Sequence, residues 1–390
     1  MSGIAGWVGE ADPRVLDAML AAIDYRGDKI DTATGPGVAL GYRFWAGRPG
    51  KSPAIHRASG HLAACAGTLA PAVESPAATL HDLLRPGGGG TDRLDGAFAA
   101  ALFDADSGVL TLVRDPFGVR SLYYVEHRGT FYFATELKQL LAIPDLPVEL
   151  NHAAVHKYLT FSFVPGEAVP IKGIRRLLPG HIAHFSRGSL TATPYFTLRE
   201  QIDPALEDQD AAVRKVRGLA EQGVARRLNG EAEVGLYLSG GLDSSGVAVW
   251  LKKAGVGIRA FSLDFGDRGQ EREEAQQVAR HLDIPLQFVT ATGATIDPIL
   301  TDLVWKLDLP FGDAVTGPQY LLGQAARAAG LSAVFNGEGG DQLFGGWTTK
   351  PMVAAAVFGS LFEGDAESRE ETYLRSYHRF YGLEDQLYSA

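Results

Sequence analysis

Hydrophobic and polar positions alternate in two different ways along this chain of 390 residues. In the first half, short apolar or aromatic runs are bounded by Gly, Asp and Pro, which is typical of strands. These runs occupy residues 37–42, 98–103, 109–113, 121–125 and 131–133. Residues 13–23 instead place apolar side chains at the 3.6-residue spacing of an amphipathic helix. The first half is therefore predicted to be α+β with antiparallel sheets.

The second half has a different period, in which strands and helices take turns. Strands are predicted at residues 233–238, 259–265, 285–289 and 333–336, and helices at 245–253, 271–282, 298–307 and 318–329. Such alternation is typical of a parallel sheet with helices on both faces. The polar stretch 198–210 separates the two patterns, so we expect one domain over 1–200 and a second over 210–390.

Composition and charge exclude some classes of binding partner and indicate the cellular compartment. Lys plus Arg is 36 and Asp plus Glu is 46, which gives a net charge of −10. Because proteins that bind nucleic acid normally carry a basic surplus, no nucleic-acid partner is expected. The lone cysteine, Cys65, excludes a disulfide within the chain and a cysteine zinc site. The N-terminus has no signal-peptide pattern and no apolar stretch is long enough to span a bilayer, so we expect a cytoplasmic protein without a membrane partner.

The strongest chemical signal is the string Leu-Ser-Gly-Gly-Leu-Asp-Ser-Ser at residues 238–245, between a predicted strand and a predicted helix. Its glycines let the backbone approach a ligand closely. Serine hydroxyls and the amides of a helix start can bind phosphate oxygens, and Asp243 can hold Mg²⁺ beside them. The plain alternative is a well-capped turn between strand and helix.

A second string, Asn-Gly-Glu-Gly-Gly-Asp-Gln-Leu-Phe-Gly-Gly-Trp, occupies residues 336–347 after another predicted strand. Ligands of doubly wound sheets bind beyond the carboxyl ends of the strands, so both strings are expected on one rim. Asp341 is a candidate second carboxylate for the metal, and Glu338 a candidate for proton transfer or substrate contact. The plain alternative is a glycine-rich loop with solvated acids.

Together, the two strings resemble the glutamine-hydrolysing asparagine synthetase family, and the resemblance runs over nearly the whole chain. Further matching strings lie at residues 2–8, 94–99, 114–120, 134–138 and 178–181. The resemblance implies an N-terminal-nucleophile (αββα) glutaminase-like domain followed by an α/β pyrophosphatase-loop domain of the adenine nucleotide α-hydrolase-like type. In that family, glutamine releases ammonia in the first domain, and ammonia attacks an acyl-adenylate in the second. Members are commonly dimers.

The same resemblance implies roles for individual residues. By position, ATP would be bound by Leu238, Ser239, Gly240, Gly241, Asp243, Ser244 and Ser245. Leu263 would lie against the adenine, and Asn336 and Gly337 would also contact the nucleotide. Asp243 and Asp341 would hold Mg²⁺, and Glu338 would act catalytically near the acyl carbon.

The glutaminase half departs from the family pattern. Ser2 stands where the family has its nucleophilic cysteine; a serine with a free α-amine can still be a nucleophile. Ala-Gly-Thr at 66–68 replaces the Asn-Gly-Glu string of the family's glutamine pocket. The family's Gly-Asp-(Thr/Ser) string has no counterpart within 74–82. At residues 25–29, Tyr-Arg-Gly-Asp-Lys stands where the family has His-Arg-Gly-Pro-Asp. Arg43 still matches the arginine that binds the glutamine carboxylate. Because a site that loses its buried polar partners loses its substrate, we expect an inactive glutaminase.

The second departure is in the C-terminal region. The family continues with further helices that complete the acyl-substrate pocket, whereas this chain stops at Ala390, and residues 367–387 match only the first of those helices. The basic residues of the missing region normally stabilise pyrophosphate and the transition state. We expect that a partner chain supplies them, that the chain is a shortened form, or that it does less than full synthesis.

Three functions remain open on the sequence. The first is an ATP-dependent, AMP-forming amide-bond synthetase that adenylates a small-molecule or peptide carboxylate for attack by ammonia or a substrate amine. Relatives with ruined glutaminase domains, the β-lactam synthetases and lasso-peptide cyclases, suggest this reading by resemblance. The second is glutamine-hydrolysing asparagine synthesis with Ser2 as nucleophile. The third is a nucleotide-binding pseudo-enzyme or scaffold subunit that needs a partner chain. We expect either a homodimer or a partner chain that completes the C-terminal region.

Overall fold

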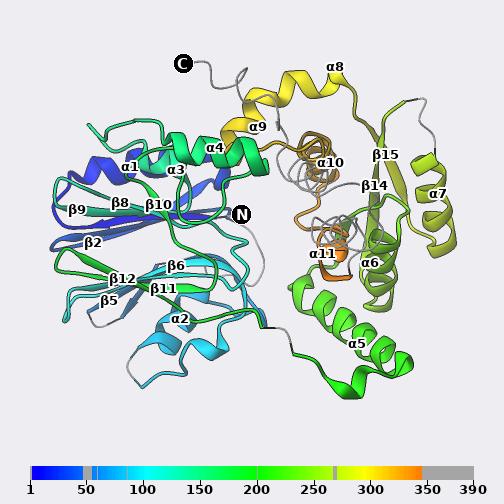
Figure 1. Cartoon of the computed structure of the whole chain (residues 1–390), viewed down its shortest axis with the longest axis horizontal. Coiled ribbons are helices and arrows are strands. Elements are labelled where there is room, and N and C mark those ends of the chain that lie inside the picture. The colour runs from blue at the N-terminus through cyan, green and yellow to red at the C-terminus, as the bar shows by residue number, and fades with distance from the viewer. Residues whose placement is uncertain are drawn as a thin grey trace, which may run out of the picture. The chain divides into compact units, whose positions relative to one another are not determined.

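A computed structural model describes residues 2–46, 55–58, 60–85, 87–199, 201–266 and 270–344. The chain divides into two compact units (Figure 1). The N-terminal unit comprises Met1–His156 and Val164–Gln201, and the C-terminal unit comprises Lys157–Phe163 and Ile202–Ala390. The expected first helices at 367–387 lie outside the described residues.

The N-terminal unit contains two six-stranded sheets whose neighbouring strands are all antiparallel. The first has the order β10 (Arg175–Arg176), β8 (Tyr123–His127), β9 (Thr130–Ala134), β1 (Gly3–Val8), β3 (Val38–Phe44), β2 (Lys29–Gly35). The second has the order β12 (Ser189–Pro194), β11 (His181–Ser186), β7 (Val109–Arg114), β6 (Gly96–Asp104), β5 (His61–Leu69), β4 (His56–Ala58). The helices are α1 (Pro13–Ala21), α2 (Pro76–Leu84) and α3 (Leu137–Leu140), with short 3₁₀ turns at η1 (Asp24–Arg26) and η2 (Thr91–Arg93). Helix α4 (His152–Phe161) begins in this unit, and its residues from Lys157 on belong to the C-terminal unit.

The main core of this unit lies between the two sheets. It joins fully buried side chains of the first sheet, such as Ile4 and Phe133, to those of the second, such as Ala66 and Leu112. On the outer face of the second sheet, Leu80 of α2 packs over Cys65. On the outer face of the first sheet, α1 approaches β3 so closely that a Cβ at position 41 would lie 2.7 Å from Cδ1 of Leu20. The layers are therefore α, β, β, α, and the predicted α+β class with antiparallel sheets is confirmed.

A buried turn after β7 shows how polar groups support this unit. Asp115 is fully buried, and its carboxylate accepts hydrogen bonds from the backbone amides of residues 117, 119 and 120 at 2.9–3.2 Å. Arg114 donates to the carbonyl oxygens of Arg120 (2.6 Å), Leu177 (2.6 Å) and Gly118 (2.8 Å). Burial lowers the pKa of the Arg114 guanidinium to about 10. The residues at 114–120, which match the family, thus stabilise this turn through their hydrogen bonds.

The C-terminal unit is built on a four-stranded sheet in which all neighbours are parallel. The order is β15 (Leu286–Thr290), β14 (Gly257–Asp264), β13 (Glu233–Tyr237), β16 (Val334–Phe335). The helices are α5 (Gln209–Leu228), α6 (Leu242–Lys253), α7 (Gln270–Leu282), α8 (Gly293–Ile296), α9 (Leu300–Leu307), α10 (Thr316–Ala328) and α11 (Gly340–Phe344), with 3₁₀ turns at η3 (Pro204–Leu206) and η4 (Asp297–Ile299).

Helices cover both faces of this sheet, as predicted. On one face, buried side chains of α6 and α7, including Leu251 and Ala275, pack on β13 and β14. On the other face, Leu322 and Ala326 of α10 pack on Phe261. The parallel-sheet prediction for the second half is therefore confirmed.

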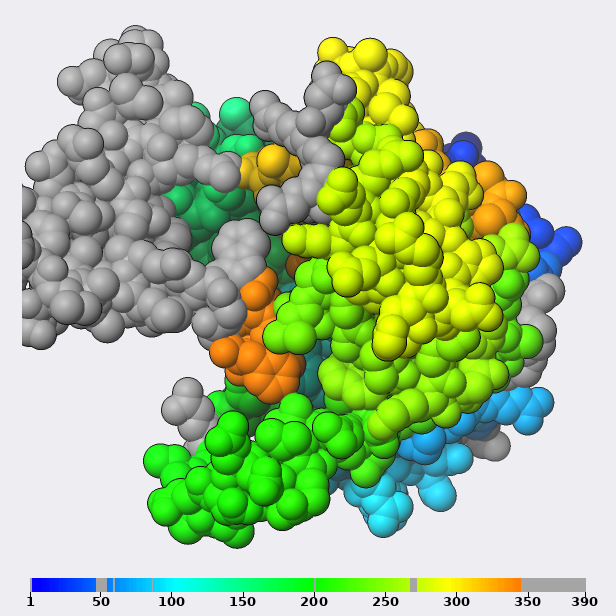
Figure 2. Space-filling model, turned by 90° about the vertical axis from the view of Figure 1, so that its right-hand side faces the viewer, coloured from blue at the N-terminus to red at the C-terminus, as the bar shows by residue number. Residues whose placement is uncertain are grey.

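Helix α5 was not predicted. Of its 20 residues only Val224 is buried, so it lacks the continuous apolar stripe by which a helix is recognised in a sequence. Figure 2 shows α5 as the green ridge along the lower edge of this face of the molecule. The predicted helix at 298–307 is α9, and it is preceded by α8 and η4, which the pattern missed.

None of the helices in the described part of the chain combines the length and hydrophobicity needed to cross a bilayer.

Candidate functional site

The C-terminal unit contains a cavity of about 1050 Å³ at the carboxyl ends of β13, β14 and β16. Ten of the sequence-predicted residues line it: Leu238, Ser239, Gly241, Asp243, Ser244, Leu263, Asn336, Gly337, Glu338 and Asp341. Both sequence strings therefore reach one cavity. Gly240 and Ser245 are absent from its lining; Gly240 lies in the loop after β13, and Ser245 lies in the first turn of α6.

The loop between β13 and α6 is held by its own serine hydroxyls. Ser244 Oγ lies 3.1 Å from Ser239 Oγ, accepts from the amide of Ser239 at 3.3 Å and donates to the carbonyl of Gly241 at 3.2 Å. Ser245 Oγ donates to the carbonyl of Gly240 at 3.2 Å. The sequence suggested that these hydroxyls bind a ligand; in the structure their hydrogen-bond partners belong to the loop itself. They fix the loop's shape so that the first amides of α6, which no side chain caps, remain available for an anion.

Three glycines allow the two strings and α7 to come together. Gly240 has φ +87°, and a Cβ there would lie 2.5 Å from Cβ of Glu274 on α7. A Cβ at Gly337 would lie 2.7 Å from the amide nitrogen of Ser244. A Cβ at Gly340 would overlap the carboxylate of Asp243, at 2.7 Å from its Oδ1. Only residues without a Cβ permit these contacts, so the glycines are a steric requirement of the site.

The carboxylates of this site suit a magnesium ion bound with phosphates. Asp243 lies in the first turn of α6, and its carboxylate lies against the backbone of Gly340. Asp341 directly follows Gly340 in the sequence and also lines the cavity. Mg²⁺ prefers oxygen ligands and is commonly held by one or two carboxylates together with phosphate oxygens and water. The two carboxylates therefore fit the expected ion. Among the described residues, no group of three or more His, Cys, Asp or Glu forms a site for a metal held by protein alone.

The sequence missed the opposite wall of the cavity, which includes Asp313, Thr316 and Gln319 at the start of α10. The Asp313 carboxylate accepts from the amides of Val315 (2.9 Å) and Thr316 (2.7 Å) and from Thr316 Oγ1 (2.8 Å). Gln319 Nε2 donates to Glu338 Oε1 at 2.9 Å. The available signal was an Asp shortly before a helix start, where its side chain can accept from the backbone amide two residues on.

The two residues predicted for the N-terminal unit lie near the start of β1. Ser2 directly precedes β1, and Arg43 on β3 is the register partner of Gly3. Arg43 donates from Nε to the carbonyl of Gly27 (2.8 Å) and from Nη1 to that of Leu20 (3.1 Å). Two of its five donors therefore connect β3 to α1 and to the segment that follows α1.

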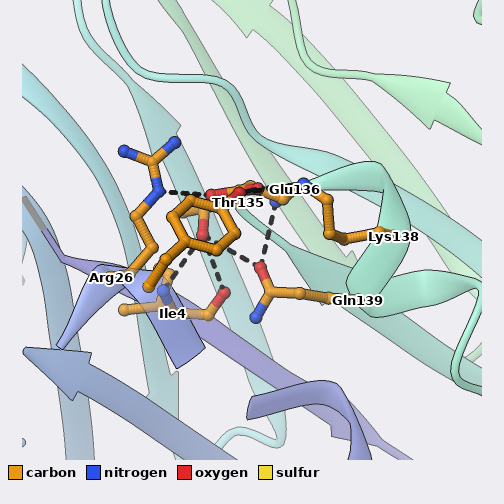
Figure 3. Close-up of polar contacts among 7 residues, drawn as sticks. Ile4, Arg26, Thr135, Glu136, Lys138 and Gln139 are labelled. Carbon is orange, nitrogen blue, oxygen red and sulfur yellow. Dashed lines mark hydrogen bonds and ion pairs between the residues drawn. The ribbon is translucent and has the colours of Figure 1, made fainter. Parts of the chain in front are cut away.

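A buried ionic cluster holds the same segment from the other side (Figure 3). Arg26 Nε donates to Glu136 Oε1 at 2.5 Å, and Lys138 Nζ pairs with Oε2 of the same carboxylate. Thr135 Oγ1, on the preceding residue, bonds both the amide and the carbonyl of Ile4 at 3.2 Å. Glu136 and Lys138 are only 5% and 7% exposed. Since removing one partner of a buried ion pair costs about 3–5 kcal/mol, the cluster is a structural support of the unit.

Comparison with known proteins agrees with the geometry of both units. The family model described as asparagine synthase matches residues 215–387, and the one described as glutamine amidotransferase domain matches residues 78–196. The asparagine synthetase (glutamine-hydrolyzing) 1 of Bacillus subtilis is 29% identical over 259 residues, which cover 65% of this chain and 40% of the relative. A putative asparagine synthetase of Mycobacterium bovis is 31% identical over 272 residues, which cover 66% and 40%.

Among solved structures, a glutamine phosphoribosylpyrophosphate amidotransferase from B. subtilis aligns over 86% of this chain and 90% of its own, with 12% identity and a TM-score of 0.38. The matches to the two curated relatives span about 40% of the relatives' length. Three features agree with the two family models. They are the strings at 238–245 and 336–347, the parallel sheet that brings the described part of both strings to one cavity, and the preceding αββα unit. The chain therefore carries an asparagine synthase domain over residues 215–387 and a glutamine amidotransferase domain over residues 78–196, and it is similar to asparagine synthetases.

Proposed function

We propose that the C-terminal unit binds ATP with Mg²⁺ in its cavity and forms an amide bond by way of an adenylated carboxylate. The carboxylate belongs to a small molecule or a peptide, and the nitrogen comes from ammonia or from a substrate amine. The N-terminal unit has a scaffolding role in this proposal, because Ser2 and residues 66–68 depart from the glutamine site of the family.

The observation that carries the proposal is the meeting of two strings at one helix start. The carboxylate of Asp243 lies against the backbone of Gly340, and both strings line the same cavity. The amides at the start of α6 carry the positive end of the helix dipole, which favours phosphate. Mg²⁺ held by Asp243 and Asp341 would neutralise part of the phosphate charge.

The chemistry has two steps. In the first, a carboxylate oxygen of the substrate attacks the α-phosphorus of ATP, and the bond to the β-phosphate oxygen breaks to release pyrophosphate. In the second, the amine nitrogen bonds to the acyl carbon, AMP leaves with the electron pair of the carbon–oxygen bond, and the amine gives up a proton. Glu338 lines the cavity and is the carboxylate proposed to take that proton.

Pyrophosphate release from the full chain tests this function. The protein is given ATP and Mg²⁺ with each of a panel of carboxylates, and with glutamine, ammonium or no nitrogen source. We expect release that depends on the carboxylate but not on glutamine. Asp243→Ala should abolish it, whereas Asp17→Asn, which removes an exposed carboxylate on α1, should not.

Other outcomes would point elsewhere. Release that requires glutamine, and that is lost in Ser2→Ala, would establish the glutamine-hydrolysing alternative. Nucleotide binding with no pyrophosphate under any of these conditions would contradict the stand-alone enzyme and favour a scaffold or a missing partner chain.

A further inference from the structure

One hydrogen bond joins two residues that line the cavity and come from different segments of the chain. Gln319 on α10 donates from Nε2 to Oε1 of Glu338, which lies between β16 and α11, at 2.9 Å. Both residues line the cavity. The interaction therefore connects α10 to the residue proposed for proton transfer.

The position of Gln319 is set by the packing of its helix. Asp313 binds the first turn of α10 through two backbone amides and the Thr316 hydroxyl. Pro318 is buried, and Leu322 and Ala326 are 3% and 1% exposed in the core beside the sheet. Because these contacts determine which way the helix faces, Gln319 extends from a rigid support.

Glu338, by contrast, is an exposed side chain on a short loop between two glycines. Among the residues that the structure describes, only Gln319 hydrogen-bonds to its carboxylate. A glutamate side chain free to rotate loses rotamer entropy whenever it is held in one orientation. A bond from a rigid helix reduces that loss before the substrate arrives.

We propose that Gln319 is a positioning residue that holds the Glu338 carboxylate in the cavity by binding Oε1. The other oxygen, Oε2, then faces the reacting amine. As the nitrogen–carbon bond forms and AMP leaves with its electron pair, the amine proton passes to Oε2. The proposal rests on the proposed function, and it assigns Gln319 to the second step alone.

The first test separates the two steps in the full-length protein. Gln319→Met keeps the length of the side chain and removes the donor. The control, Gln324→Met, makes the same change on the same helix at an exposed residue outside the cavity lining. Binding of Mg²⁺ with α,β-methylene-ATP is measured by calorimetry, and amide formation is measured with ATP, ammonium and each carboxylate of the panel used to test the proposed function.

We expect Gln319→Met to leave nucleotide affinity and the KM for ATP within about twofold of wild type and to lower kcat for the amide by about tenfold or more, as for a lost hydrogen bond to a charged group. Gln319→Glu should lower it at least as far, because it sets a like charge against Glu338. Equal rates for Gln319→Met and Gln324→Met would overturn the proposal. So would a loss of nucleotide affinity as large as the loss of rate.

A second test does not depend on activity. Urea unfolding of wild type, Gln319→Met, Glu338→Met and the double variant gives a double-mutant cycle. We expect the unfolding constant of the double variant to differ by about fivefold or more from the value that the two single changes predict together. Additive effects would overturn the proposal even in an active enzyme. If the cycle shows coupling but wild type forms neither pyrophosphate nor amide, the proposed function fails and the positioning of Glu338 by Gln319 stands.

Discussion

Replacing Gly340 by alanine tests the contact on which the proposed nucleotide site depends. The added Cβ would overlap the Asp243 carboxylate, so the carboxylate or the loop must move. Overpacking of this kind costs about 1–3 kcal/mol, and at about 1.4 kcal/mol per factor of ten the nucleotide affinity should fall roughly 5- to 150-fold. Gly340 is the first residue of α11, where alanine favours the helix over glycine by up to about 1 kcal/mol. The free energy of unfolding should therefore change less than the free energy of binding.

The assay is calorimetric titration of the full chain with α,β-methylene-ATP and Mg²⁺, together with urea unfolding of each variant. The matched control is Gly218→Ala in α5, a helical glycine whose added Cβ would meet nothing within 4 Å. It should raise stability by up to about 1 kcal/mol and leave binding unchanged. Wild-type affinity in Gly340→Ala, or an equal loss of affinity in Gly218→Ala, would refute the steric reasoning.

Three further predictions concern the N-terminal unit. Arg114→Met should lower the free energy of unfolding by about 2–4 kcal/mol in urea titrations, because three carbonyls in buried or part-buried hydrogen bonds lose their donor. The pKa of His81 is below its ordinary value of 6.5 because of burial and the neighbouring His56 and His61. The unfolded chain therefore takes up the proton first, and stability present above pH 6.5 is lost as the pH falls below it. His81→Asn should flatten that decline between about pH 7.5 and about pH 5.5. Burial raises the pKa of the Cys65 thiol to about 12, so it should react with an aromatic disulfide only after denaturant unfolds the chain.

The fold class could be predicted because each half has a regular hydrophobic period. Strands β6 and β7 alternate between two cores, and α7 and α10 place small or apolar side chains on the sheet. Helix α5 was not predicted because its packing against α6 fully buries only Val224 and leaves Val213, Val216 and Leu219 exposed. A pattern that depends on contacts with a later segment leaves little periodic signal in the sequence.

The site was predictable on one wall only. The strings at 238–245 and 336–347 follow strands, and parallel strands bring their carboxyl ends to one edge. Gln319 and Asp313 belong to the middle of a connection, and their place at the cavity depends on how α10 is rotated by Leu322 and Ala326. Residue type also gave no sign that the Ser244 hydroxyl bonds the backbone of Ser239 and Gly241, which the structure shows.

The remaining matches to a glutamine site in the N-terminal unit have a structural explanation. Arg43 donates to the carbonyls of Gly27 and Leu20, and Arg26 pairs with the buried Glu136. Gly27 lies so close to the backbone of Phe44 that a Cβ would overlap it. These residues are needed to join β3 to the segment after α1 whether or not glutamine binds. Residues 2 and 66–68 differ from the family pattern, as do residues 25–29 and 74–82. The proposal that nitrogen comes from ammonia or an amine therefore rests on those positions, since the retained arginines also have backbone and carboxylate partners within the fold.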